Sequence, residues 1–175
     1  MNSIIFVCLG NICRSPIAEG CAKKLAATNN LDIKIASAGT SRYHVGENPC
    51  TNSVKICKIH DINIANYKGA QFKKEDINFY GLVVALDENN YNDLHELGVT
   101  NLVKLGDYGY SSRDVPDPYY FNGFEGFERV YEMIESCVEK LFKKESLEDG
   151  VFSKFTGLVD ENFQTDDLKY AQIVK

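Results

Sequence analysis

The sequence predicts an α/β fold, in which a four-stranded parallel sheet carries helices on both faces. Short apolar runs of strand length alternate along the chain with longer segments that have a helical pattern. The first run, at residues 3–8, is almost continuously apolar, as expected for a strand that is buried on both faces. Strands that alternate with helices favour parallel pairing through right-handed crossovers.

The expected elements follow one another with short connections. A helix is expected to open at Ser15-Pro16 and to run to about residue 29, because proline is favoured in the first turn of a helix. In a sheet of this kind ligands bind beyond the carboxyl ends of the strands, so the loop after residue 8 is the expected position of a site. The remaining expected strands lie at 32–38, 81–87 and 101–105, and the remaining expected helices at 50–60, 73–80, 88–98 and 124–144.

The composition is that of an ordinary globular domain. The 175 residues are 44% hydrophobic and 25% charged, which is enough for a sizeable core. The net charge of −6 gives no support to binding of nucleic acid or of an anionic membrane. No apolar stretch approaches the ~20 residues of a membrane span. The N-terminus has no secretory signal pattern, so a cytoplasmic protein is expected.

The last part of the chain differs from the rest. Residues 146–175 contain apolar residues and several acids, but they follow no clear period. We therefore expect one domain over residues 1–145 and a C-terminal extension over residues 146–175 that is loosely docked or disordered.

Six cysteines could indicate either a disulfide framework or a metal site. A chain of this size with an apolar core does not need disulfides. The sequence has no C-x-x-C or H-E-x-x-H pattern, so neither a metal nor a cofactor is expected. Four of the cysteines lie in helical patterns and are expected to be small buried hydrophobic residues, namely Cys21, Cys50, Cys57 and Cys137.

The stretch VCLGNICRSP combines a nucleophile with the parts of a phosphate-binding loop. Cys8 ends the first expected strand, and its thiolate would be the nucleophile. The five residues between Cys8 and Arg14 suffice to curl backbone amides around a tetrahedral anion beside a helix N-terminus. Gly10 and Asn11 tolerate the left-handed backbone angles of such a curl. Arg14 would grip two phosphate oxygens, and Ser15 would donate its hydroxyl to the thiolate.

A cysteine that displaces an alcohol or phenol from phosphate also needs a general acid. The stretch VPDPYY supplies Asp117 in a loop that Pro116 and Pro118 stiffen. Tyr119 and Tyr120 are large flat side chains suited to lining a cleft for an aromatic leaving group. Asp117 is therefore the candidate acid.

Three separated motifs together resemble one family of enzymes. They are CLGNICRSP near the N-terminus, SAGTS after the second expected strand and DPYY before the last expected helix. In order and spacing they resemble the low-molecular-weight protein tyrosine phosphatases over residues 1 to about 144. The resemblance implies a four-stranded parallel sheet, no metal cofactor, and phosphotyrosine-containing proteins as substrates.

The resemblance also implies a two-step mechanism and a set of site residues. Cys8 would attack phosphotyrosine while Asp117 protonates the leaving phenol, and Asp117 would then activate the water that hydrolyses the phosphocysteine. Cys8 and Cys13 could form a disulfide that protects the nucleophile from over-oxidation. The implied phosphate-binding residues are Leu9, Gly10, Asn11, Ile12, Cys13, Arg14 and Ser15, the loop-supporting residues are Asn11, Ser15 and Ser37, and the substrate cleft is formed by Leu9, Tyr43, Tyr119 and Tyr120.

Two positions depart from the family pattern in the segment NYKGAQ. Tyr67 stands where the family usually has a histidine that is buried against the loop-supporting residues, and Ala70 stands where an arginine is common. Either the Tyr67 hydroxyl replaces the histidine as a hydrogen-bond partner, or the network around the loop is looser.

Other interpretations of the cysteine loop remain open on the sequence. A thiol-dependent arsenate reductase resembles this fold, but such enzymes have further cysteines after the third strand, where this chain reads ALDENNYNDL. A phosphocysteine carrier of the sugar-transport type would not need Arg14 or Asp117. A phosphotyrosine-binding or scaffold module would gain little from a nucleophile together with an acid.

Overall fold

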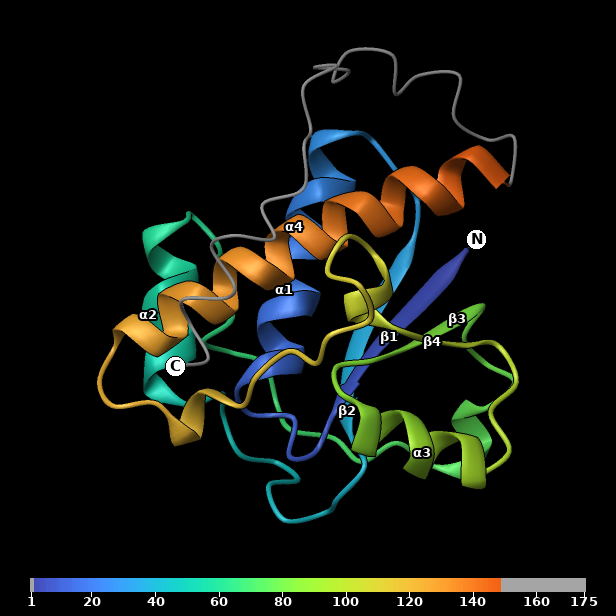
Figure 1. The fold of residues 1–175 in the computed structure, drawn as a ribbon, viewed down its shortest axis with the longest axis horizontal. Helices are drawn as coiled ribbons and strands as arrows, with labels where there is room; N and C mark the ends of the chain where they lie inside the picture. Colours follow the sequence, from blue (N-terminus) through green and yellow to red (C-terminus); the bar gives the residue numbers. More distant parts are fainter. Residues whose placement is uncertain (1, 149–175) are drawn as a thin grey trace.

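The apolar run at the N-terminus forms β1 (Ser3–Cys8), the strand around which the sheet is built (Figure 1). The computed structural model describes residues 2–148 of the chain. The sheet is parallel throughout and has the strand order β2-β1-β3-β4, which confirms the predicted fold class. The other strands are β2 (Lys34–Gly39), β3 (Leu82–Ala85) and β4 (Leu102–Lys104).

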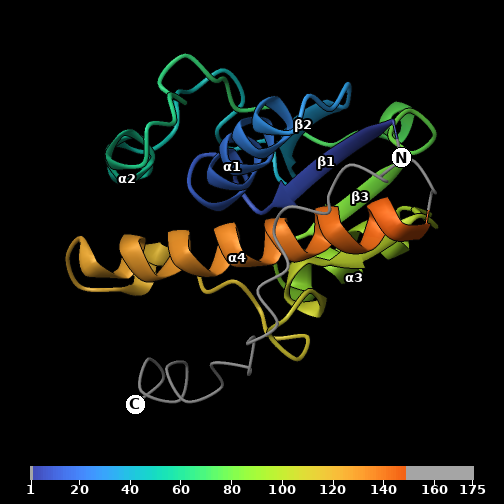
Figure 2. The same ribbon diagram turned by 90° about the horizontal axis from the view of Figure 1, so that it is seen from above.

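The helices occupy both faces of this sheet, as the sequence predicts (Figures 1 and 2). On one face α1 packs beside α4 and α2, and on the other face α3 packs against β3 and β4. The α-helices are α1 (Arg14–Thr28), α2 (Thr51–Ile59), α3 (Glu88–Glu96) and α4 (Glu125–Glu148), and the short 3₁₀ turns are η1 (Lys74–Asp76), η2 (Leu105–Asp107) and η3 (Pro118–Tyr120).

One expected helix is wrong in length. The sequence pattern predicts a helix at residues 73–80, whereas only the three residues of η1 are helical. The carboxylate of Asp76 accepts a hydrogen bond from the backbone N–H of Lys73. This bond caps the first turn of η1, and the chain continues from Ile77 as a turn.

The alternation of side chains along β1 explains why the strand is apolar throughout. Ile4 and Phe6 are fully buried under α1 and α4, and Ile5 and Val7 pack in the second core cluster with Leu94 of α3. Each such side chain contributes roughly 1.5–3 kcal/mol when it leaves water. A polar residue on either face of β1 would therefore be costly, and the strand is held firmly in register.

The register brings the carboxyl ends of three strands together. Cys8 pairs with Gly39 at the end of β2, and Val7 pairs with Ala85 at the end of β3, two residues before Asp87. The chain leaves β1 towards β2 on one side and later adds β3 on the other, so this edge is the point where the strand order reverses. Ligands bind at such a point in open α/β sheets.

The last helix is longer than expected. Helix α4 continues to Glu148, four residues past the predicted helix end at residue 144. The rest of the predicted extension, from residue 149 onward, lies outside the described residues. Across residues 2–148, none of the helices has the length and apolar character needed to cross a membrane.

Candidate active site

The loop between β1 and α1 is held from outside by its carbonyl groups. The carbonyls of Cys8, Leu9 and Ile12 accept backbone hydrogen bonds at 2.7–2.9 Å from Thr40, Ser41 and Cys50, respectively. The backbone N–H of Asn11 instead donates to Cys8 Sγ at 3.3 Å. Outward carbonyls and an inward amide are the arrangement of an anion-binding nest next to the N-terminus of α1.

The two small residues of the loop are needed for different reasons. Asn11 has a φ of 55°, in the left-handed region that asparagine tolerates. Gly10 was expected to share this conformation, but its φ is not positive. The constraint at Gly10 is space, because a Cβ there would lie 2.9 Å from Cδ2 of His44. Gly39 is constrained in the same way, since a Cβ would lie 2.7 Å from the carbonyl oxygen of Leu9.

A buried polar network supports the loop from behind. The amide nitrogen of the Asn11 side chain donates to both Ser15 Oγ and Ser37 Oγ at 2.9 Å. Its amide oxygen accepts from the backbone N–H of Ala70 at 2.8 Å. Ser37 in turn donates to Glu19 at 2.5 Å. Since Ala70 takes part through its backbone, the network is closed without a side chain at that position.

Tyr67 reaches this network only indirectly. Its ring lies 4.6 Å from Lys23 Nζ, and Lys23 forms an ion pair of 2.5 Å with Glu19. Burial, and then the negative charge of Glu19, raise the pKa of Tyr67, while Lys23 opposes the shift. Glu19 is the side chain that completes the hydrogen bonding of Ser37, so the role considered for the Tyr67 hydroxyl is filled by a carboxylate of α1.

The candidate nucleophile and its cationic neighbour are both buried. Cys8 Sγ lies 3.0 Å from Ser15 Oγ. The Arg14 guanidinium forms an ion pair with Asp87 at 2.5 Å and donates to the Val115 carbonyl at 3.0 Å. Burial alone would lower the pKa of Arg14, but the charges of Cys8 and Asp87 outweigh it and raise that pKa. Arg14 is therefore a fixed positive charge beside the sulfur.

The candidate acid, Asp117, is the N-cap residue of η3. Asp117 accepts a hydrogen bond from the backbone N–H of Tyr119 at 3.0 Å, which orients its carboxylate. The other carboxylate oxygen lies 3.5 Å from Arg14 Nη2, and the side chain is 30% exposed. The arginine thus links Asp117 with the loop that carries Cys8.

The predicted cleft residues, which we call the rim, are exposed at the surface. Leu9 is 49% exposed, Tyr43 79%, and Tyr119 and Tyr120 83% each. The last two rings pack edge to face with their centroids 5.6 Å apart. These side chains expose apolar surface to whatever approaches the loop.

Sequence reasoning missed three residues around the loop. Asp87 and Glu19 were not singled out, although Asp87 directly follows a strand at the same sheet edge as Cys8 and could have been found from that position. Cys50 was expected to be a buried hydrophobic residue, and this is wrong. It is half-buried at the N-terminus of α2, and its Sγ lies 2.8 Å from that of Cys13. The other three, Cys21, Cys57 and Cys137, are buried as predicted.

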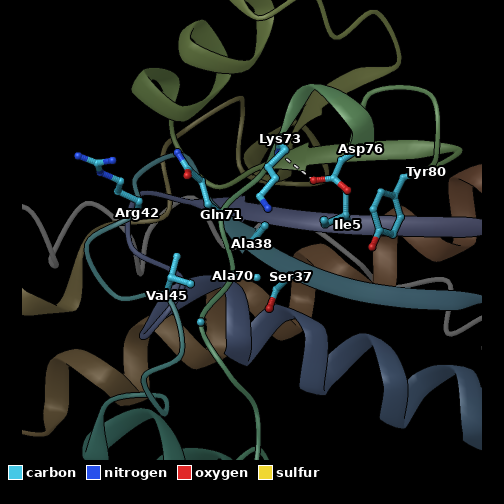
Figure 3. A pocket seen from close by; sticks show the side chains of 11 residues that line it. Ile5, Ser37, Ala38, Arg42, Val45, Ala70, Gln71, Lys73, Asp76 and Tyr80 are labelled. Atoms are coloured by element: carbon cyan, nitrogen blue, oxygen red, sulfur yellow. Dashed lines mark hydrogen bonds between the residues drawn. The ribbon is translucent and has the colours of Figure 1, made fainter.

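A hollow of about 600 Å³ opens behind the loop-supporting residues (Figure 3). Ser37 and Ala70 line it, and the amine of Lys73 points toward Ala38 on its wall. Ala70 contributes only a methyl group to the wall of this hollow. The candidate nucleophile and acid are not among the lining residues of this hollow.

Comparison with known proteins agrees with this geometry. The model of the low molecular weight phosphotyrosine protein phosphatase family matches residues 3–151. The chain belongs to this family. A low molecular weight protein-tyrosine-phosphatase of Staphylococcus saprophyticus, PtpA, is 38% identical over 81% of this chain and 92% of its own. The low molecular weight phosphotyrosine protein phosphatase of Saccharomyces cerevisiae is 36% identical over 82% of this chain and 94% of its own.

Solved structures of the family share the fold. A protein tyrosine phosphatase from Entamoeba histolytica, with Hepes in its active site, has a TM-score of 0.78 and 31% identity. The alignment covers 87% of this chain and 100% of the amoebic chain. The family match over residues 3–151 includes the sheet, its helices and the loop that carries Cys8.

Proposed function

We propose that the chain is a protein tyrosine phosphatase that hydrolyses phosphotyrosine, and small aryl phosphates, through a cysteinyl phosphate. The observation that carries the proposal is the convergence of Cys8, Arg14 and Asp117 at one sheet edge. An arginine fixed by Asp87 lies next to both the sulfur and the acid. Family membership and the names of the relatives support the same activity.

In the first step Cys8 Sγ attacks phosphorus. The loop amides and the Arg14 guanidinium hold the phosphoryl oxygens, so the charge that spreads over them is stabilised by donors already in position. Protonated Asp117 gives its proton to the bridging oxygen as the bond to phenol breaks, which contributes typically 10²–10⁴-fold. The Ser15 hydroxyl at 3.0 Å stabilises the sulfur when it carries negative charge.

In the second step the phosphocysteine is hydrolysed. Asp117, now ionised, takes a proton from water, which attacks phosphorus and displaces Cys8 Sγ. The sulfur leaves as a thiolate and accepts hydrogen bonds from Ser15 Oγ and the backbone N–H of Asn11. No metal is required for either step, since fixed N–H donors and Arg14 carry the electrostatic stabilisation.

The substrates proposed are phosphotyrosine-containing proteins. Leu9, Tyr43, Tyr119 and Tyr120 offer apolar surface around the loop, and this surface suits a planar leaving group. A phosphoserine side chain is shorter and aliphatic, so it gains less from these rings.

The experiment compares the wild-type protein with Cys8→Ser on p-nitrophenyl phosphate and on a phosphotyrosine peptide, with EDTA present. We expect wild-type hydrolysis to survive the chelator and the variant to be inactive. Wild-type protein that binds the peptide in reduced buffer without releasing phosphate would instead establish a phosphotyrosine-binding module. Release of arsenite from arsenate with thiol consumption, and no phosphate release, would establish a reductase.

A further inference from the structure

Two cysteine sulfurs meet beside the phosphate-binding loop. Cys13 is the N-cap residue of α1 and Cys50 is the N-cap residue of α2. Their Sγ atoms lie 2.8 Å apart in a hydrogen bond. Cys8 Sγ has other neighbours, namely Ser15 Oγ and the backbone N–H of Asn11. The thiol of Cys13 is therefore directed to α2 and not to the nucleophile.

The surrounding hydrogen bonds hold this pair in place. The backbone N–H of Cys50 donates to the Ile12 carbonyl at 2.7 Å, next to Cys13 in the chain. The Ser53 hydroxyl donates to the Cys13 carbonyl at 3.2 Å and lies 3.0 Å from Cys50 Sγ. These bonds fix the backbone of both cysteines. To form a disulfide, the two Sγ atoms need to approach each other by only roughly 0.8 Å, to the ~2.05 Å of an S–S bond.

The two thiols differ in acidity in the way that oxidation requires. The hydrogen bond from Cys13 lowers the pKa of Cys50, burial opposes it, and the Ser53 hydroxyl adds to the lowering. The same hydrogen bond, together with burial, raises the pKa of Cys13. The N-terminus of α2 also favours negative charge at Cys50. Both residues are only half-buried, so a small oxidant can reach them.

We propose that Cys13 and Cys50 form a reversible disulfide when a hydroperoxide oxidises the protein, and that this bond ties the phosphate-binding loop to the start of α2. The Cys50 sulfur reacts with the hydroperoxide, and the Cys13 sulfur then resolves the oxidised Cys50 by forming the disulfide. The pairing excludes a Cys8–Cys13 disulfide, because the two share Cys13. While Cys13 is bonded to Cys50, it is not available to form a disulfide with Cys8.

The reaction balances with one molecule of hydrogen peroxide. The Cys50 thiolate attacks one oxygen, the O–O bond breaks, and the hydroxide released takes up the proton that Cys50 lost, which gives Cys50 sulfenic acid and water. Cys13 sulfur then attacks Cys50 sulfur, the S–O bond breaks, and hydroxide leaves with the Cys13 proton as a second water. Two thiols are oxidised to one disulfide, and the peroxide is reduced.

The chain provides a direct assay because trypsin separates the relevant cysteines. Cleavage after Arg14 releases peptide 1–14, which holds Cys8 and Cys13, and cleavage after residues 42 and 55 releases peptide 43–55, which holds Cys50 alone. The full chain is treated with hydrogen peroxide until two thiols per molecule are lost. Free thiols are then alkylated, and the digest is analysed by mass spectrometry without reduction.

We expect peptide 1–14 to be cross-linked to peptide 43–55, and dithiothreitol to release the two. The cross-link should persist in Cys8→Ser, where Cys13 is the only thiol of its peptide, so the result does not depend on phosphatase activity. Peptide 1–14 recovered only with an internal Cys8–Cys13 disulfide would overturn the proposal. Peptide 43–55 recovered only in alkylated form, or a thiol count that peroxide leaves unchanged, would overturn it as well.

Two variants control the assignment. Cys50→Ser keeps a hydroxyl cap at α2 and should abolish the cross-link. Cys57→Ala removes a cysteine that lies two turns further along the same helix, and the cross-link should remain. Circular dichroism of each variant checks that the fold is retained. If the cross-link survives in Cys50→Ser, another thiol is its true partner and the proposal fails.

Discussion

The active site has a buried part, here called the floor, and an exposed part, the rim. The two differ in burial and in how many partners their side chains have. On the floor, Cys8, Asn11, Arg14 and Ser15 are buried, and each has a hydrogen-bond or ion-pair partner. At the rim, Leu9 is half exposed and the three tyrosines are mostly exposed. Buried charges and dipoles act strongly and are costly to leave unpaired, whereas exposed rings contribute modest contact energy. We infer that the floor sets the chemistry and the rim selects the substrate.

The largest effect should come from the residue that joins floor and rim. Asp117→Asn keeps the shape of the side chain and its bond to the Tyr119 N–H but cannot give up a proton. We expect kcat/KM for phenyl phosphate, which reports only the steps up to release of the phenol, to fall by about 10²–10³-fold, within the range for a general acid. On p-nitrophenyl phosphate the loss should be smaller, because p-nitrophenolate leaves readily without protonation. Equal losses on both substrates would contradict the assignment of Asp117 as the acid.

A smaller effect should follow a change beneath the floor. Asp87→Asn retains a good N-cap for α3 but removes the charge that holds Arg14. We expect kcat/KM for p-nitrophenyl phosphate to fall about tenfold, since a charge-assisted hydrogen bond contributes about 1.5–3 kcal/mol. Asp93→Asn, an exposed carboxylate on the same helix, is the matched control and should have wild-type kinetics. If both variants behave alike, the ion pair with Asp87 does not position Arg14.

Changes at the rim should alter substrate binding and leave the chemistry intact. Tyr119→Ala is expected to raise KM for a phosphotyrosine peptide by about 2–10-fold, because an aromatic contact contributes about 0.5–1.5 kcal/mol. Competitive inhibition by inorganic phosphate, which occupies only the floor, should keep its wild-type constant. An inhibition constant that rises in parallel with KM would show that the rim also shapes the loop.

The smallest effect on kcat and on the free energy of unfolding is expected at Tyr67. Tyr67→Phe should leave kcat within about twofold and the free energy of unfolding within about 0.5 kcal/mol, because Glu19 already pairs with Ser37. Glu19→Gln is the informative counterpart. It weakens a buried, charge-assisted bond and should lower the free energy of unfolding by about 1–3 kcal/mol. Urea denaturation measures both, and a larger effect for Tyr67→Phe would reverse these roles.

Much of this molecule could be predicted from local sequence patterns. Strand β1 begins and ends at the expected residues 3 and 8, because its short apolar run suits a strand that is buried on both faces. The predictions failed at η1, where a helical pattern forms only three helical residues, and at Cys50, where a residue expected to be a buried hydrophobe forms a polar contact. Periodicity reports which face is apolar, and it does not report which atoms from distant segments meet.

By itself the sequence determined the α/β architecture and the spacing that closes a loop between Cys8 and Arg14, since both depend on residues close together in the chain. Only the tertiary structure decided the partners of that loop. Asp87 reaches Arg14 across 73 residues of sequence separation, and Cys50 reaches Cys13 across 37. Such contacts depend on strand order and helix packing. These bring together side chains that are far apart in the sequence, and their spacing in the sequence does not predict the contact.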